Sequence, residues 1–112
     1  MTVQMKLNKI PFEQIENGVK TVELRLNDEK RSAIRVGDTV LFTLADSSRS
    51  LLCEVTALHR YPSFEELLST PLLRASGFDG YTVSEAVECM RSYYSAESEK
   101  KYGVLGIEIM LK

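Results

Sequence analysis

The polar stretch from Gly18 to Arg25 carries the side chains most capable of chemistry. Lys20, Glu23 and Arg25 supply two cations and a carboxylate, and Thr21 adds a hydroxyl. Glu23 and Arg25 share one face of an extended chain, so the carboxylate can hold the guanidinium ready for a phosphate or a base edge. Lys20 can bind a phosphate as a point charge or, if desolvated, act as a base. From the residue types and spacing alone, the stretch fits either a ligand site or an exposed strand face that carries an ordinary surface ion pair.

Alternation of apolar and polar residues indicates that this stretch lies on a β-strand, whose polar side we do not expect to be core. A short helix should precede the strand, because Pro11 suits a first helical turn and Gly18 can end a helix in the left-handed conformation. The same alternation or an apolar run predicts further strands at residues 2–7, 39–44, 50 to about 60 and 105–111. Residues 27–35 form a charged connection between two of them.

The second half of the chain is mostly helical. Capping-box patterns at Ser63–Glu66 and Thr82–Glu85 open two helices, and Ser95 can cap a third. Gly103 should end the third helix before the last strand. The elements together predict one α+β domain over residues 1–112, with about five strands, an early short helix and a helical insertion before the last strand. The first and last strands can pair only if the sheet curls or the chain returns, which favours a small β-barrel.

The charge balance excludes proteins that coat nucleic acid through bulk positive charge. The 112 residues carry a formal net charge of -2. Residues 1–60 hold 9 basic and 8 acidic side chains, whereas residues 61–112 hold 5 and 8. The basic residues therefore gather near the polar strand, and Arg31 lies among them as a candidate phosphate contact or as part of a solvated loop.

Neither cysteine has a Cys or His at metal-ligand spacing, so we expect no metal, no disulfide framework and no cofactor. The sequence has no apolar leader and no run of 18 apolar residues. We therefore expect a cytoplasmic protein that does not enter a membrane. No pattern in the chain predicts an oligomeric state.

The residues resemble a known family. The segment Gly18–Arg25 fits the G-x-K-x-x-E-x-R signature of ASCH domains, which are small relatives of the PUA domains of RNA-modification proteins. The turn Val36-Gly37-Asp38 and the closing segment at residues 102–108 fit the same family in the same order. The resemblance implies a PUA-like β-barrel with the early helix at one end. It also implies a cleft beside the signature that accepts RNA or a nucleotide-like ligand.

Some bacterial members of the ASCH family, which this chain resembles, are amidohydrolases that deacetylate N4-acetylcytidine with a Lys, a Thr nucleophile and a Glu. Lys20 matches the Lys, Glu23 occupies the nucleophile position, and Asp79 occupies the carboxylate position. A carboxylate at the nucleophile position removes the hydroxyl that would attack the acetyl group. Thr21 does not replace it, because Thr21 lies two residues, or roughly 6–7 Å, away from that position along the strand. The residues therefore do not match the amidohydrolase mechanism. An alternative chemistry pairs Lys20 with Glu23 or Asp79 as acid and base on an RNA phosphodiester.

Aromatic residues add one candidate ligand contact. Tyr81 follows a glycine in a loop and can stack on a base or simply pack, whereas Tyr94 lies on an apolar helix face typical of core. His59 has no partner at a readable spacing and is expected to be structural or solvent-facing. The leading prediction is a domain that binds RNA or a small nucleotide-like ligand. The alternatives are a hydrolase acting on RNA or modified nucleosides and a protein-interaction module.

Overall fold

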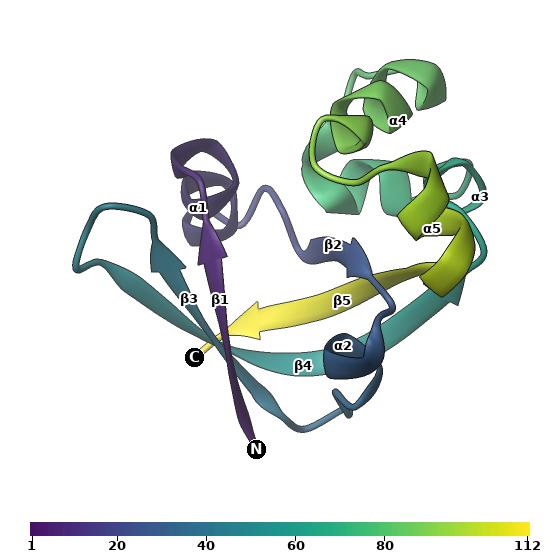
Figure 1. Ribbon diagram of the computed structural model, residues 1–112. Helices are drawn as coiled ribbons and strands as arrows, with labels where there is room; N and C mark the ends of the chain where they lie inside the picture. The colour runs from purple at the N-terminus through teal and green to yellow at the C-terminus, as the bar shows by residue number, and fades with distance from the viewer.

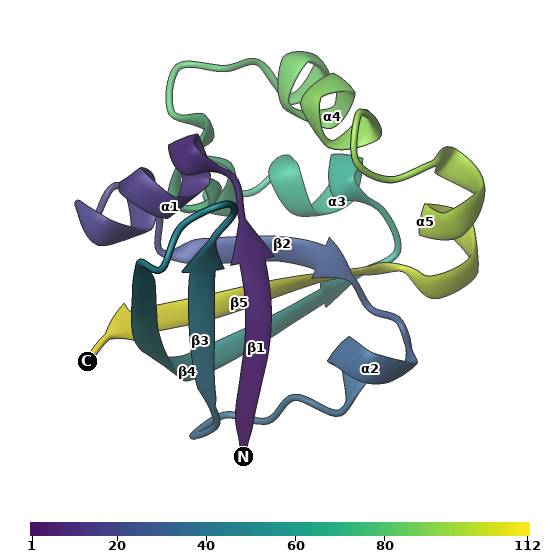
Figure 2. The same cartoon turned by 60° about the vertical axis from the view of Figure 1, so that its left-hand side comes forward.

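The computed structural model describes residues 1–112, and a curled five-stranded sheet runs through it (Figure 1, Figure 2). The strands are β1 (Thr2–Leu7), β2 (Val22–Leu26), β3 (Thr39–Leu44), β4 (Ser50–Tyr61) and β5 (Val104–Leu111). Their order in the sheet is β1-β3-β4-β5-β2. β1 and β3 are parallel, and every other neighbouring pair is antiparallel. The strands β1 and β2 are therefore the two edges of the sheet.

The sheet curls into a half-barrel, as the predicted PUA-like α+β fold requires. The first and last strands do not pair with each other, because β1 pairs with β3 while β5 lies between β4 and β2. A register shift in β4 between Val55 and Ala57 marks a bulge, and bulges increase local twist and bend the strand that carries them. The curl leaves a space between the edge strands that only side chains can bridge.

The helices are α1 (Lys9–Glu16), α2 (Glu29–Ser32), α3 (Phe64–Leu68), the π-helical turn η1 (Arg74–Phe78), α4 (Val83–Arg91) and α5 (Ala96–Tyr102). The predicted capping box is present at α4, where the side chain of Thr82 and that of Glu85 each accept the other residue's backbone N–H. The charged connection also contains the short helix α2, which was not expected, because the side chain of Asp28 accepts the Arg31 N–H and caps a helical turn there. None of the helices is long and apolar enough to cross a membrane.

Two hydrophobic clusters hold these elements in place. The first lies inside the curl and includes Phe12 and Ile15 of α1 with Phe42 of β3. The second packs α3 and α4 against β2, through Leu67, Met90 and other side chains. Figure 1 and Figure 2 both show α1 and α4 on either side of β2. The strand that carries the polar stretch is therefore flanked by helices from both halves of the chain.

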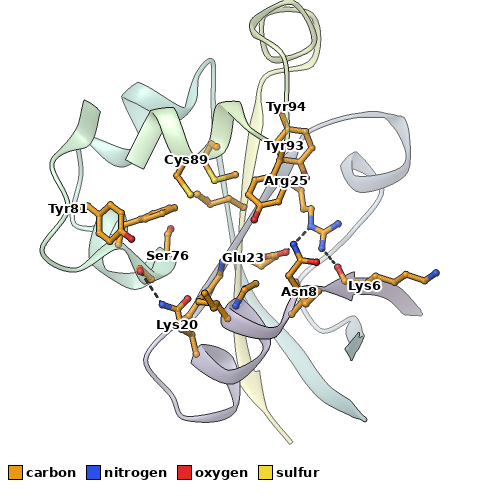
Figure 3. A pocket seen from close by; sticks show the side chains of 18 of the residues that line it. Lys6, Asn8, Lys20, Glu23, Arg25, Ser76, Tyr81, Cys89, Tyr93 and Tyr94 are labelled. Carbon is orange, nitrogen blue, oxygen red and sulfur yellow. Dashed lines mark hydrogen bonds and ion pairs between the residues drawn. The ribbon is translucent and has the colours of Figure 1, made fainter. Parts of the chain in front are cut away.

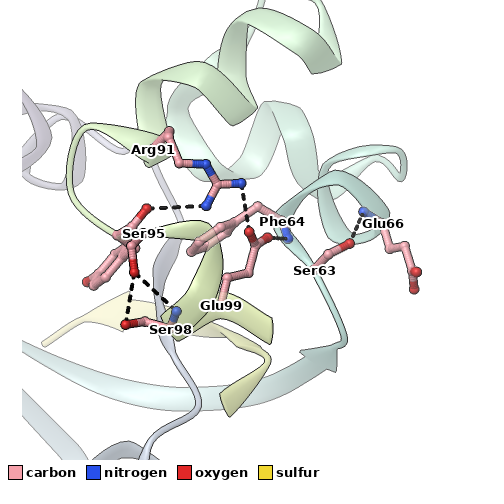
Figure 4. A network of polar contacts seen from close by, with 8 residues as sticks. Ser63, Phe64, Glu66, Arg91, Ser95, Ser98 and Glu99 are labelled. Carbon is pink, nitrogen blue, oxygen red and sulfur yellow. Dashed lines mark hydrogen bonds and ion pairs between the residues drawn. The ribbon is translucent and has the colours of Figure 1, made fainter. Parts of the chain in front are cut away.

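A buried carboxylate fixes the helices around α4 (Figure 4). Glu99 of α5 is 6% exposed, and it accepts the backbone N–H of Phe64 at 2.6 Å and Nη2 of Arg91 at 2.8 Å. Phe64 begins α3 and Arg91 ends α4, so one side chain links three helices. This network positions α4, which forms one wall of the site described next.

Candidate functional site

Lys20, Glu23 and Arg25 form a continuous ion triad on the polar side of β2. Lys20 Nζ lies 3.0 Å from Oε1 of Glu23, and Arg25 Nε lies 2.8 Å from Oε2 of the same carboxylate. Both carboxylate oxygens are therefore held by a cation. With two positive charges and one negative charge, the triad carries a net charge of +1.

The triad is far less exposed than a surface ion pair. The side chains of Lys20, Glu23 and Arg25 are 10%, 6% and 14% exposed. The expectation that the polar side of β2 is not core is wrong for Glu23, because η1, α4 and α1 cover that side. Burial by itself raises the pKa of Glu23, but the charges and hydrogen bonds of Lys20 and Arg25 outweigh it and hold the pKa below 4.5.

Arg25 also joins the two edges of the sheet. Its Nη2 donates to the backbone carbonyl of Lys6 on β1 at 3.0 Å while its Nε donates to Glu23 on β2. The planar guanidinium makes both contacts at once through two different nitrogens. A lysine at this position has a single nitrogen, which cannot occupy both places. The orientation of Arg25 is therefore fixed from both sides.

A cavity of about 360 Å³ opens beside the triad (Figure 3). Its walls come from the β1–α1 connection, from η1, and from α4 with the residues that follow α4. Ten of its 19 lining residues are hydrophobic, so the charged triad faces a largely apolar wall. The volume lies at the lower end of the range of about 300–1,000 Å³ found for small-molecule sites. A cavity of this volume suits a small ligand or a single monomer unit of a polymeric ligand.

Aromatic rings form much of the wall opposite α1. Tyr81 lines the cavity, is 49% exposed, and makes an edge contact with Phe78 at 5.2 Å between ring centroids. Tyr93 is 58% exposed and Tyr94 is partly buried; both line the cavity as well. Tyr94 also stacks on Phe64, as expected of a core residue, so it serves both the core and the cavity wall.

The turn η1 contributes two small residues that sequence reasoning missed. Ser76 is 1% exposed and lines the cavity. Gly77 has φ +91°, and a Cβ there would lie 2.7 Å from Oε1 of Gln14 and 3.4 Å from Cδ of Lys20. The positive φ therefore favours glycine at this position, and an added Cβ would also have to displace the end of the Gln14 side chain. A glycine between a serine and an aromatic residue was the only signal available in the sequence.

Three of the predicted site residues lie outside this cavity. The Asp79 side chain is 72% exposed, does not line the cavity, and lies 4.0 Å from Nε of Arg74. Arg31 pairs with Asp28 at 3.0 Å on α2. Thr21 is exposed and lines a shallower hollow next to Met110, while its backbone N–H donates to Ala75. The structure thus brings Lys20, Glu23, Arg25 and Tyr81 to one cavity and leaves these three aside.

Of the remaining candidate groups, His59 and Cys53 lie away from the cavity, whereas Cys89 lines it. Nε2 of His59 lies 2.9 Å from Oε1 of Glu108, a contact between neighbouring strands. Cys53 is buried in the first cluster, and burial raises the pKa of its thiol. Cys89 is half-buried and lines the cavity. No group of three or more His, Cys, Asp or Glu side chains in residues 1–112 is placed to hold a metal ion.

The family follows from comparison with known proteins. The model of the ASCH domain matches residues 5–112 of the chain. The chain belongs to the ASCH domain family. No curated protein matches this ASCH domain.

Solved structures share the fold of this chain. The crystal structure of hypothetical protein PH0355 is similar to this ASCH domain at 35% identity and a TM-score of 0.90, and the match covers 100% of both chains. The solution structure of protein PF0455 from Pyrococcus furiosus matches at 35% identity and a TM-score of 0.79, over 99% of this chain and 97% of that one. An ASCH domain from Lactobacillus crispatus shares the fold at 14% identity, with a TM-score of 0.66 over 98% and 79% of the chains.

Proposed function

We propose that this ASCH domain binds RNA or a nucleotide-like ligand in the cavity beside Lys20. The observation that carries the proposal is the triad of Lys20, Glu23 and Arg25, which places a net positive charge against a cavity with aromatic walls. A ligand with an anionic or carbonyl oxygen and a flat ring fits both features.

Both cations keep hydrogen-bond donors for such a ligand. A lysine ammonium has three N–H donors and an arginine guanidinium has five. Lys20 uses one N–H donor for Glu23. Arg25 uses one donor for Glu23 and one for the Lys6 carbonyl. Because Glu23 and Lys6 fix the orientation of Arg25, little side-chain freedom remains to be lost when a ligand binds.

The aromatic walls favour a ring-containing ligand over a bare phosphate. Tyr81 and Tyr93 are each about half exposed at the cavity and offer rings for stacking. Stacking of one base on an aromatic side chain contributes roughly 1–3 kcal/mol in single-strand binders. The cavity therefore suits a nucleotide or one unpaired residue of an RNA strand.

The ionised state of the Glu23 carboxylate favours a binding role over a role in hydrolysis. An efficient general acid or base has a pKa near the working pH, whereas the charges and hydrogen bonds of Lys20 and Arg25 outweigh burial and lower the pKa of Glu23 from its usual value. Both of its oxygens are already engaged by cations. Asp79, the other candidate carboxylate, does not line the cavity. Glu23 thus fits the role of a group that orients two cations.

Titration of single-stranded RNA and of nucleoside monophosphates against paired variants tests the proposal. Lys20→Met keeps the aliphatic stem and leaves Glu23 paired with Arg25, whereas replacing both cations would leave a buried carboxylate unpaired. The matched control is Lys30→Met, since Lys30 is exposed on α2 and away from the cavity. We expect the affinity to fall roughly tenfold in Lys20→Met and little in Lys30→Met. Equal affinities in the two variants would overturn the proposal.

The dependence of the RNA affinity on salt concentration gives a second test of the proposed site. A protein that neutralises Z phosphates on a single strand shows a slope of about −0.7Z in a plot of log affinity against log salt. With two cations at the cavity, we expect a slope of roughly −1 to −2. A steep slope would indicate binding along an extended surface instead of in the cavity.

A further inference from the structure

We propose that Ser76 is a specificity-determining contact of this cavity, which reads an uncharged hydrogen-bonding group of the ligand. This inference rests on the proposed function and adds a residue and a recognition chemistry to it. Ser76 is one of the residues that line the cavity, and its Oγ is buried and has no hydrogen-bond partner within the protein. Figure 3 shows its side chain on the η1 wall, near Tyr81.

A buried hydroxyl without a partner is unusual, because leaving it unpaired costs about 1–3 kcal/mol. Three exposed serines of this chain bond to the backbone of their own helices. Ser32, Ser69 and Ser92 each donate to the backbone carbonyl of a residue three or four positions earlier, at 3.1, 2.6 and 2.6 Å. Ser76 makes no such bond, although it also lies in a helical turn.

The turn around Ser76 is held in place from both sides. The backbone N–H of Thr21 donates to the carbonyl of Ala75 at 2.8 Å, and Nε2 of Gln14 donates to the carbonyl of Gly77 at 3.4 Å. Gly77 has a positive φ of +91°, a backbone conformation that glycine adopts without strain. The position of Ser76 at the cavity is therefore set before any ligand arrives.

The chemistry of Ser76 complements that of the triad. Lys20 and Arg25 suit an anionic or carbonyl oxygen, whereas an uncharged hydroxyl can donate to a ring nitrogen or carbonyl and accept from an amino group. Phe78 and Tyr81, on the same wall, lie where a ring would stack. Ser76 is thus placed to contact the edge of a heterocyclic base, a group that a sugar phosphate lacks.

The test compares Ser76→Ala and Ser76→Cys with Ser92→Ala. Ser76→Cys keeps most of the shape but weakens the hydrogen bond, and Ser92 is exposed and outside the cavity. The probes are the nucleoside 5′-monophosphate that binds the wild type most tightly and ribose 5-phosphate, which has no base. We expect both Ser76 variants to bind the nucleotide roughly two- to tenfold more weakly and to bind ribose 5-phosphate as the wild type does. Ser92→Ala should leave both affinities unchanged.

The thermal unfolding midpoint separates this role from a structural one. Ser76→Ala removes an unpaired buried hydroxyl, so its midpoint should equal or exceed that of the wild type. Unchanged nucleotide affinity in both Ser76 variants, or an equal loss for the nucleotide and for ribose 5-phosphate, would overturn the role of Ser76. The proposed function would survive either result if Lys20→Met still weakened binding. A wild-type protein that binds no nucleotide and no RNA would overturn both proposals.

Discussion

Arg25 and Lys6 lie on opposite edges of the curled sheet, and Nη2 of Arg25 donates to the backbone carbonyl of Lys6 at 3.0 Å. The same guanidinium holds Glu23 through Nε. A residue of the family signature therefore connects β1 to β2 where no backbone ladder does. In this arrangement one side chain supports the half-barrel and lines the cavity.

Arg25→Lys should lower the free energy of unfolding by about 1–2 kcal/mol, because an ammonium cannot reproduce both contacts of the fork. Denaturant unfolding measures this loss, and hydrogen exchange should show faster exchange at the β1 edge. Arg35→Lys, at an exposed position, serves as the matched control. Equal stability of the two variants would mean that Arg25 does not support the sheet.

Glu23 should make stability depend on pH in acid. Despite its burial, its two cationic neighbours hold the pKa in the folded protein below 4.5, so the carboxylate stabilises the fold above the unfolded pKa. That contribution is lost as the pH falls through the folded pKa. Glu23→Gln should therefore lower the free energy of unfolding by about 3 kcal/mol at pH 7.

The difference in the free energy of unfolding between the wild type and Glu23→Gln should become smaller as the pH drops below about 4.5. Denaturant unfolding from pH 7 to pH 2.5 measures it, with Glu88→Gln as the control at an exposed position of α4. A difference that stays constant across that range would contradict the ionised triad.

Gly77→Ala tests the close approach of η1 to Lys20. Both Gly77 and Gly37 have positive φ, so an alanine at either costs about 1–2 kcal/mol in backbone strain. A Cβ at Gly77 additionally meets Gln14 at 2.7 Å, whereas one at Gly37 meets nothing within 4 Å. We expect Gly77→Ala to lose more stability than Gly37→Ala and, unlike it, to weaken ligand binding. Equal losses of stability in the two variants, together with unchanged ligand binding in Gly77→Ala, would show that η1 can shift to accommodate the added Cβ.

Glu99→Gln should weaken the link between α3, α4 and α5. The amide keeps one acceptor but loses the charge that pairs with Arg91, so we expect a loss of about 2 kcal/mol in the free energy of unfolding. Ligand affinity in the folded variant should fall less than in Lys20→Met, because Glu99 does not line the cavity and acts on it only through the position of α4. Chemical denaturation and a ligand titration check the two parts. A variant as stable as the wild type would contradict this account of the network.

Local patterns predicted most of the fold. Alternation in the strands and the capping residues Ser63, Thr82 and Ser95 placed the main elements, since both signals depend on neighbouring residues alone. The helix α2 was missed because its four residues carry no apolar face. The pairing of β1 with β3 depends on long-range packing, which periodicity does not encode.

The site was predicted only in part for the same reason. Glu23 and Arg25 share a strand face, so their pairing follows from spacing. The burial of the triad depends on η1 and α4, which come some 50 residues later in the chain. Ser76 and Asp79 lie three residues apart in sequence, yet only Ser76 reaches the cavity, because the chain leaves η1 at Phe78.

Thiol labelling of the wild-type protein tests the central claim most directly. Cys89 lines the cavity, whereas Cys53 is fully buried and serves as an unreactive internal reference. We predict that saturating single-stranded RNA, or the nucleotide that binds most tightly, slows the reaction of Cys89 with a thiol reagent at least severalfold. An unchanged rate at saturation would place the ligand elsewhere and contradict the assignment of this cavity as the binding site.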